Sequence, residues 1–548
     1  MNRHTSDILT DLVDAAGRAG TTRRDLVKLA GAAALAAGLA GTMPGGARVF
    51  AQADKNALVY GSGQDISNLD PHTGNDYSIT FAQRATYDSI LRFEGNPPVV
   101  KPLVAKEVTG SEDAKTWTLK LDPAAKFPDG SAVDGDVIKW NFARLLKKNL
   151  GVAWMFADVM TADSVKVVDA TTVEIALTKS FAPFDLILPW LFLANPAVVK
   201  EHVDGDDDGE KWLQQNAAGS GPYTISQWQP GTTYQFDRRA DYWFTTPGIT
   251  KPIDTFVWRI IRESSSKRLS MEAGEVQWGD TFSVEDIEGL SAESQFTINQ
   301  IPAYTPFAVK LNNASGPTAD LNVRKALAAA LDYDSVLAVA NGRGTLMEGP
   351  LPPQFAPWHT DNLPLIRFNM DEAKTYLAAS EQYKDGFEIE YVYVTGLANE
   401  EQIGLILLDA LSQLNITVTM TPLVWPDLVA RVADPTKAPG MVAVYNSVNY
   451  MDPDNFLWQS YHSSQAGSWA NASQFKNDEI DKLLEDGRST VDPDARKKIY
   501  DEAQTKIVDL AVELWLYCEI PNEAWVTQLG DTPNNANSDV RLLEYSAS

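Results

Sequence analysis

The clearest pattern of apolar and polar positions lies in the second half of the chain. Residues 387–394 alternate as a strand, 416–424 forms a second strand, and 441–448 is an apolar run typical of a third. Helices are predicted between them, at 399–414 and 425–432. This β-α-β-α-β order predicts parallel strands with right-handed crossovers. Because ligands bind beyond the carboxyl ends of such strands, we expect a crevice rim just after the third strand.

The first half of the chain shows shorter strands with turns between them. Residues 117–121 alternate apolar and polar, as in a half-buried strand, and 165–168 with 173–177 indicates a hairpin. A second strand pair is predicted at 223–228 and 233–236, around a Gln-Pro-Gly turn. This half is therefore predicted to contain mixed sheet.

A glycine-containing segment follows the strand predicted at 57–60. Gly61-Ser62-Gly63 invites comparison with a dinucleotide-binding loop, but Ile66 stands where the third glycine belongs. We therefore predict a tight turn here.

The amino-terminal residues indicate an export signal. Residues 22–28 contain Arg23-Arg24 and lead into the Ala/Gly-rich apolar stretch 29–43, and Ala51-Gln52-Ala53 offers a small-x-small cleavage site. The segment resembles a twin-arginine signal, with cleavage expected after Ala53 and a periplasmic location. An uncleaved amino-terminal anchor is the alternative.

Composition excludes several classes of function. The 548 residues carry a net charge of -27, which argues against nucleic acid or an anionic membrane as partner. The single cysteine, Cys518, excludes an intrachain disulfide and a cysteine-based zinc site, and we expect it to be buried. The widely spaced histidines of the exported part show no metal-ligand spacing, so neither a metal nor a cofactor is predicted.

The segment 449–462, just after the third strand, is rich in groups that could hold a solute. It contains two carboxylates, two asparagine amides and four aromatic rings. We select Asn449, Tyr450, Asp452 and Trp458 as candidate ligand contacts. The competing interpretation is a helix that Asp452 caps, with its apolar side chains packed inward.

Four blocks in order along the chain resemble extracellular solute-binding protein family five, the receptors of peptide, nickel, opine and related ATP-binding cassette (ABC) importers. The blocks are 87–93 with 116–121 and 126–131; 219–223 with 239–243; 311–313 with 323–327 and 331–332; and 452–456. Together they cover nearly the whole exported chain.

The resemblance implies an α/β fold, the two-lobed type II periplasmic binding protein with three structural domains and a discontinuous first lobe. After the signal at 1–53, lobe one would comprise domain I (54–90, 215–300 and 516–548) and domain II (91–214). Lobe two, or domain III, would hold 301–515.

The resemblance also implies a receptor that performs no bond chemistry. It would capture a peptide-like or similarly sized polar solute by hinge closure, as a monomer, and deliver it to an ABC permease driven by a separate ATPase. A secreted acidic glycoside hydrolase with paired carboxylates and aromatic platforms is the competing hypothesis.

Two further expectations concern the solute. Members of this family commonly contact it near Asn75, Asp76 and Tyr77. In dipeptide-binding relatives, an aspartate that pairs with the peptide's amino group occupies the position of Asn449. With only Asp452 and Asp76 as nearby carboxylates, free dipeptides are predicted to bind poorly, because a buried ammonium needs a counter-charge. A neutral, oligosaccharide-like or opine-like solute is predicted to bind better, stacked on Trp458 or Tyr450.

Overall fold

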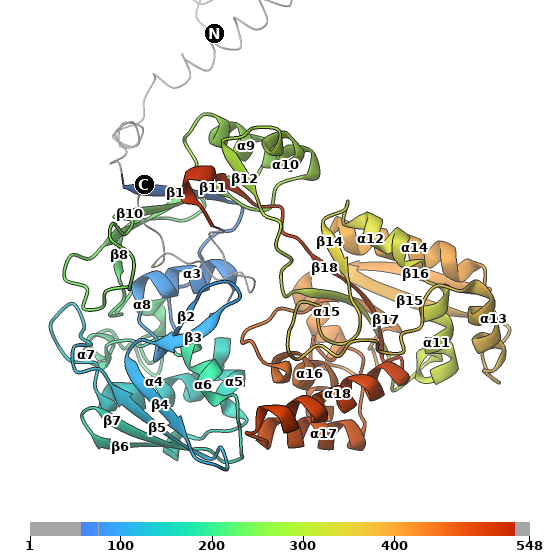
Figure 1. The fold of residues 1–548 in the computed structure, drawn as a ribbon, viewed down its shortest axis with the longest axis horizontal. Helices are drawn as coiled ribbons and strands as arrows, with labels where there is room; N and C mark the ends of the chain where they lie inside the picture. Colours follow the sequence, from blue (N-terminus) through green and yellow to red (C-terminus); the bar gives the residue numbers. More distant parts are fainter. Residues whose placement is uncertain (1–55, 75, 532–548) are drawn as a thin grey trace, which may run out of the picture. The chain divides into compact units, whose positions relative to one another are not determined.

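The computed structural model describes residues 56–74 and 76–531, which form helices and four β-sheets (Figure 1). The predicted signal and its cleavage site lie outside the described residues. Among the described residues, no helix combines the length and the hydrophobicity that crossing a membrane requires. The content is mixed α/β, as predicted.

A seven-stranded sheet draws its strands from distant parts of the chain. Its order is β12 (Phe296–Ile298), β19 (Ala524–Val526), β11 (Trp278–Gly279), β1 (Ala57–Ser62), β10 (Thr255–Ile260), β9 (Thr233–Arg238) and β8 (Tyr223–Gln229). Strand β1 runs parallel to both neighbours, and the other pairs are antiparallel. The mixed sheet and the β8–β9 pair agree with the sequence prediction.

The segment between β1 and β8 forms an antiparallel four-stranded sheet and a separate hairpin. The four-stranded sheet has the order β4 (Ala105–Gly110), β5 (Thr116–Leu121), β7 (Thr172–Ala176) and β6 (Val165–Asp169). The hairpin joins β2 (Leu91–Glu94) to β3 (Val99–Pro102). The predicted 165–177 hairpin is thus confirmed. Helices of this segment are α3 (Tyr77–Thr86), α4 (Gly135–Lys148), α5 (Trp154–Ala157), α6 (Phe184–Ile187), α7 (Pro196–Lys200) and α8 (Glu210–Leu213).

A six-stranded sheet forms from the second half of the chain. Its order is β14 (Gly344–Leu346), β18 (Glu513–Glu519), β13 (Pro306–Leu311), β17 (Met441–Tyr445), β15 (Phe387–Val394) and β16 (Ile416–Leu423). Strand β15 is parallel to both β16 and β17, which confirms the predicted β-α-β-α-β unit. Its two helices are α14 (Ala398–Ser412) and α15 (Trp425–Val432).

The remaining helices follow the sheets in chain order. Helices α9 (Ser264–Glu272) and α10 (Val284–Ser291) come between strands of the seven-stranded sheet. Six others belong to the segment of the six-stranded sheet: α11 (Leu321–Ala330), α12 (Tyr333–Val339), α13 (Met370–Ala378), α16 (Pro453–Tyr461), α17 (Asp478–Ser489) and α18 (Pro493–Asp509).

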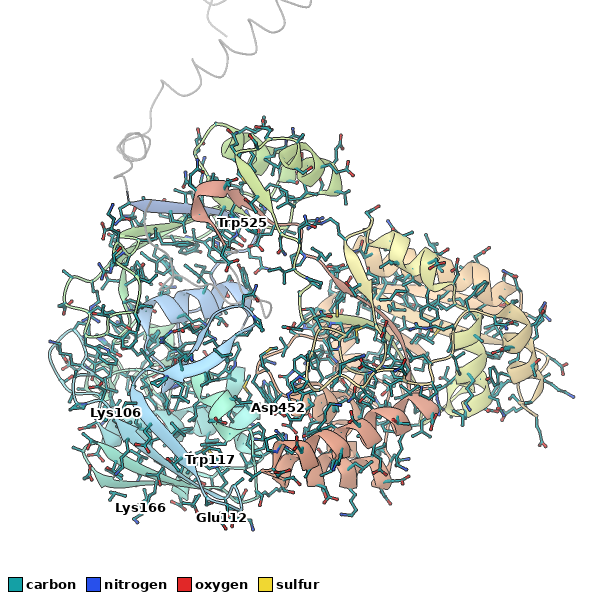
Figure 2. All side chains as sticks on the ribbon, viewed as in Figure 1. Lys106, Glu112, Trp117, Lys166, Asp452 and Trp525 are labelled. Carbon is teal, nitrogen blue, oxygen red and sulfur yellow. The ribbon has the colours of Figure 1, made fainter. Side chains whose placement is uncertain are left out.

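Two short segments join the seven-stranded and six-stranded sheets. Residues 299–305 lead from β12 to β13, and residues 520–523 lead from β18 back to β19. Each sheet has its own buried core, and Trp525 marks that of the seven-stranded sheet (Figure 2). In the described part of the chain, the backbone passes from one sheet to the other only through these two connections. They are therefore the covalent links between the two sheets.

The tight turn predicted at residues 61–63 is wrong, because strand β1 continues through Ser62. Gly61 allows a close approach between elements. A Cβ atom there would lie 3.2 Å from the side chains of Lys267 and Val276. Cys518 is buried, as predicted, and burial raises the pKa of its thiol to about 12.

Candidate functional site

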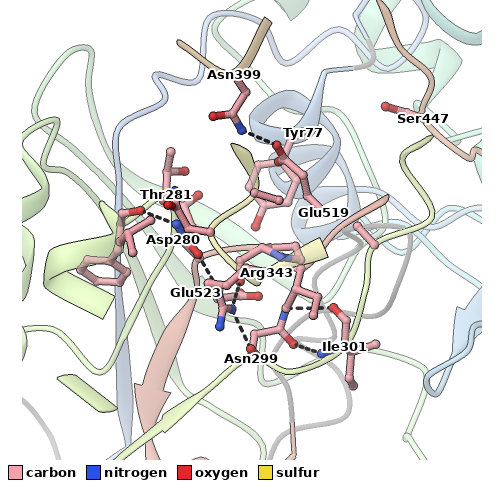
Figure 3. Close-up of a pocket in the computed structure, with 18 of the residues that line it drawn as sticks. Tyr77, Asp280, Thr281, Asn299, Ile301, Arg343, Asn399, Ser447, Glu519 and Glu523 are labelled. Atoms are coloured by element: carbon pink, nitrogen blue, oxygen red, sulfur yellow. Dashed lines mark hydrogen bonds between the residues drawn. The ribbon is translucent and has the colours of Figure 1, made fainter. Parts of the chain in front are cut away.

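A cavity of about 470 Å³ lies at the two connections between the sheets (Figure 3). Asn299, Ile301 and Ala303 line it from the first connection, and residues 520–523 from the second, next to Glu519 at the end of β18. This volume falls within the range of about 300–1,000 Å³ that small-molecule sites usually have. The other lining residues are Gln64, Tyr77, Asn96, Asp280, Thr281, Phe282, Val284, Val339, Ala340, Asn341, Arg343, Asn399 and Ser447.

Asp280 brings a carboxylate to the cavity wall, next to a buried lysine. Its Oδ1 lies 3.3 Å from Nζ of Lys267, whose side chain is 1% exposed. Tyr60 and Ser62 donate hydrogen bonds to Oδ2. The charge of Asp280 is therefore balanced by the protein itself.

Glu519 brings a second carboxylate, at the end of β18. Its Oε1 accepts hydrogen bonds from Asn399 Nδ2 and Tyr445 Oη, both at 2.8 Å. Both donors are neutral. Asn399 comes from the first turn of α14, so the carboxyl ends of β15 and β18 contribute neighbouring groups to one site (Figure 3).

Arg343 ties the two connections together. Its Nη2 donates to the backbone oxygens of Asn299 at 2.8 Å and Pro521 at 2.9 Å, and its Nε donates to the side chain of Asn522. All three acceptors are neutral, and burial lowers the pKa of the guanidinium. The backbone oxygen of Arg343 also accepts from Ile520 N. Arg343 thus fixes the relative position of the two segments.

Two of the three contacts predicted near the amino-terminal end, Asp76 and Tyr77, are described, and they lie in different settings. Tyr77 lines the cavity, and its Oη lies 3.2 Å from that of Tyr60 (Figure 3). Asp76 caps helix α3 by accepting from Ile79 N. Asn75 lies outside the described residues. Of the two described residues, Tyr77 is the one that a solute in the cavity could touch.

Asn449 and Tyr450 contact the core of the four-stranded sheet. The backbone oxygen of Asn449 accepts from Trp190 Nε1 at 2.6 Å. Tyr450 is buried in that core and donates to Asp454 at 2.7 Å. Neither lines the cavity. The half-buried side chain of Asn449 forms no hydrogen bond with any of the described residues, so its contact with solute stays a prediction.

Asp452 and Trp458 serve the packing of the segment. Asp452 caps α16, accepts from Asp454 N and forms a two-bond ion pair with Arg496 at 2.7 and 2.9 Å. The ring of Trp458 lies 3.6 Å from that of His462 and 3.4 Å from the guanidinium of Arg488. The competing interpretation of a capped, inward-packed helix therefore describes these two residues. A solute could stack on Trp458 only by displacing one of its neighbours.

The expected preference for neutral solutes assumed that Asp452 and Asp76 were the only carboxylates near the solute. Asp76 and Asp452 are both engaged in caps, whereas three other carboxylates line the cavity: Asp280, Glu519 and Glu523. Ligands bind beyond the carboxyl ends of parallel strands, and for β15 this would have indicated Asn399, five residues after the predicted strand. Glu519 gave no such signal, because strand β18 was not predicted.

Glu400, next to Asn399 on α14, is expected to make the stability of the protein depend on pH. Burial raises the pKa of its carboxyl to about 7, and the nearby charge of Glu519 adds to this, while Val394 N donates to Oε2 at 2.7 Å. The folded state therefore holds a proton that the unfolded chain releases near pH 4.5, so stability falls as pH rises from 4.5 through 7. We expect Glu400→Gln, which keeps an acceptor for Val394, to reduce the difference in unfolding free energy between pH 5 and pH 8 by about 2–3 kcal/mol.

Urea unfolding of both proteins at the two pH values measures this effect. Glu401→Gln is the matched control, because Glu401 is exposed on the same helix. Equal pH dependence of wild type and Glu400→Gln would contradict the prediction.

The chain was compared with known proteins by family and by structure. Residues 99–468 match the family described as "Bacterial extracellular solute-binding proteins, family 5 Middle". The Escherichia coli K12 protein named "Probable D,D-dipeptide-binding periplasmic protein DdpA" is 30% identical over 475 residues, covering 84% of this chain and 88% of that protein. The glutathione-binding protein GsiB of Pectobacterium atrosepticum is 24% identical, covering 83% and 87%.

Solved structures show the same fold. HbpA2 from Haemophilus parasuis superposes with a TM-score of 0.75 at 21% identity, covering 90% of this chain and 99% of the other. NikA from Brucella suis, in complex with Fe(III)-EDTA, also gives 0.75 at 21% identity, covering 89% and 99%. The fold is that of type II periplasmic binding proteins. The matched family consists of binding proteins, which leaves the hydrolase hypothesis without support. The chain belongs to bacterial extracellular solute-binding protein family 5.

Proposed function

We propose that this protein is the periplasmic receptor of an ABC importer and that it captures a peptide-like solute in the cavity at the two connections. The cavity itself carries the proposal, because both connections line it. A solute held there would touch both connections, about which the two sheets would turn on closure. Binding and closure would then be coupled through direct contact.

The peptide-like class is supported by the names of the relatives and by the lining of the cavity. The two curated relatives compared above are named for a D,D-dipeptide and for glutathione. The lining combines amides with charged groups of both signs, which suits the amide bonds and charges of a short peptide.

The remaining parts of the proposal concern export and delivery. The twin-arginine signal would be removed after Ala53, and the monomeric receptor would dock on a permease driven by a separate ATPase. The seven-stranded and four-stranded sheets would form lobe one as domains I and II, and the six-stranded sheet would form lobe two. Amino-terminal sequencing of the exported protein tests the cleavage site.

Closure on binding is the direct test of the receptor proposal. The purified protein is titrated with D,D-dipeptides, L,L-dipeptides, glutathione and neutral oligosaccharides, while small-angle scattering and denaturant unfolding are recorded. We expect a peptide to lower the radius of gyration and, at a hundredfold excess over its dissociation constant, to raise the unfolding free energy by about 2.7 kcal/mol. Stabilisation without compaction would contradict hinge closure, and turnover of any solute would contradict the receptor. Binding of oligosaccharides alone would replace the peptide-like class by a neutral one.

A further inference from the structure

Four charged side chains line the cavity, and they differ in how their charges are balanced. Asp280 has Lys267 beside it. Among the described residues, Arg343 donates only to neutral oxygens. Glu523 is buried and accepts from Trp278 Nε1. The fourth, Glu519, is half-buried, and its two carboxylate oxygens differ in the hydrogen bonds that they accept.

The two hydrogen bonds that Glu519 accepts both end on Oε1. Its Oε2 accepts none from the described residues, and no lysine, arginine or histidine among them forms an ion pair with this carboxylate. Asn399 and Tyr445 therefore hold the side chain in place without neutralising it. A half-buried carboxylate in this state favours a cation that arrives from outside the protein.

We propose that Glu519 is a specificity-determining residue that binds a cationic group of the solute, an ammonium or guanidinium, through Oε2. This inference rests on the receptor function proposed above and narrows its solute class to molecules that carry such a cation. The cation would sit at the carboxyl end of β18, within reach of the amide of Asn399.

The surroundings of Glu519 agree with this role. Tyr445, one of its two donors, stacks on Phe307 at 4.3 Å, so the phenol is held by packing on the six-stranded sheet. The buried Glu400 lies close enough for the negative charge of Glu519 to raise its pKa. Two carboxyl groups near one position increase the benefit that a bound cation brings.

The test compares solutes that differ by one charge. Isothermal titration calorimetry at pH 7.5 uses the D,D- and L,L-dipeptides, their amino-terminally acetylated forms and neutral oligosaccharides. The proteins are wild type, Glu519→Gln and the control Glu401→Gln. Glutamine keeps an acceptor for Asn399 and Tyr445 and removes only the charge. Thermal melting confirms that each variant is folded.

We expect at least one free dipeptide to bind wild type and Glu401→Gln equally, and Glu519→Gln about 30-fold more weakly. Acetylation should weaken binding to wild type by a similar factor and should hardly affect binding to Glu519→Gln. Equal binding of free dipeptides to wild type and Glu519→Gln would overturn the role of Glu519 and leave the receptor proposal intact. Tight binding of acetylated peptides alone would have the same meaning. Binding of oligosaccharides alone would overturn the role of Glu519 and would also replace the peptide-like class by a neutral one. If no member of any set binds, both the peptide-like receptor and the role of Glu519 are overturned.

Discussion

Replacing Arg496 with methionine is expected to lower the unfolding free energy by about 3–5 kcal/mol. Arg496 on α18 is 6% exposed, and its partner Asp452 is 1% exposed. The two side chains share two hydrogen bonds, and the guanidinium also donates to Gly487 O at 2.8 Å. Burial raises the pKa of Asp452 even with Arg496 present. Without the guanidinium, the carboxylate must either stay charged in the core or take up a proton.

The matched control, Asp452→Asn, keeps a helix-capping side chain at the start of α16 and removes the carboxylate charge. Asparagine is as good a helix cap as aspartate, so Asp452→Asn in the Arg496→Met background should restore part of the lost stability. Urea unfolding at pH 7 measures all three proteins. A loss below about 1 kcal/mol for Arg496→Met would mean that the pair contributes no more than a surface ion pair.

Replacing Gly219 with alanine is expected to destabilise the protein by about 3 kcal/mol or more, at or above the upper end of ordinary overpacking. A Cβ atom at this position would lie 2.1 Å from the backbone oxygen of Thr86 and 2.7 Å from Cα of Tyr87. Both are backbone atoms, so no side-chain rotation can relieve the clash. Gly221, two residues on, donates its N–H to the same oxygen at 3.1 Å.

Gly63 offers the matched control for this substitution. A Cβ atom at Gly63 would have its nearest neighbour at 3.8 Å, the Cα of Arg262. Gly63→Ala should therefore leave the unfolding free energy within about 0.5 kcal/mol of wild type. If Gly219→Ala and Gly63→Ala have the same unfolding free energy, position 219 tolerates a side chain despite its short distance to Thr86.

Much of the fold was predictable because periodicity reports local structure. Strands 387–394 and 416–424 and the helix at 425–432 agree with the observed elements to within a residue. The strand predicted at 441–448 is shorter in the structure, because β17 ends at Tyr445. The next residue, Asn446, donates a hydrogen bond from Nδ2 to Ser460 Oγ at 2.7 Å. Long-range pairings, such as that of β1 with β10 and β11, leave no local signal in the sequence.

The candidate site was less predictable, because it forms where distant segments meet. The sequence placed Asn449 correctly after a parallel strand, yet tertiary packing directs Tyr450 and Asp452 into buried contacts. The groups that line the cavity come from connections that have no periodicity of their own. A half-buried carboxylate such as Glu519 looks like any other in a chain with 73 acidic residues.

The place of β19 in the seven-stranded sheet has a consequence for synthesis of the protein on the ribosome. Strand β19 lies between β12 and β11, and Trp525 pairs with both Thr297 and Trp278. A nascent chain that has not reached Ala524 cannot join those two neighbours. The whole six-stranded sheet is translated before this gap can be filled, so its core can form first. Completion of the seven-stranded sheet must follow translation of β19 and is among the last steps of folding.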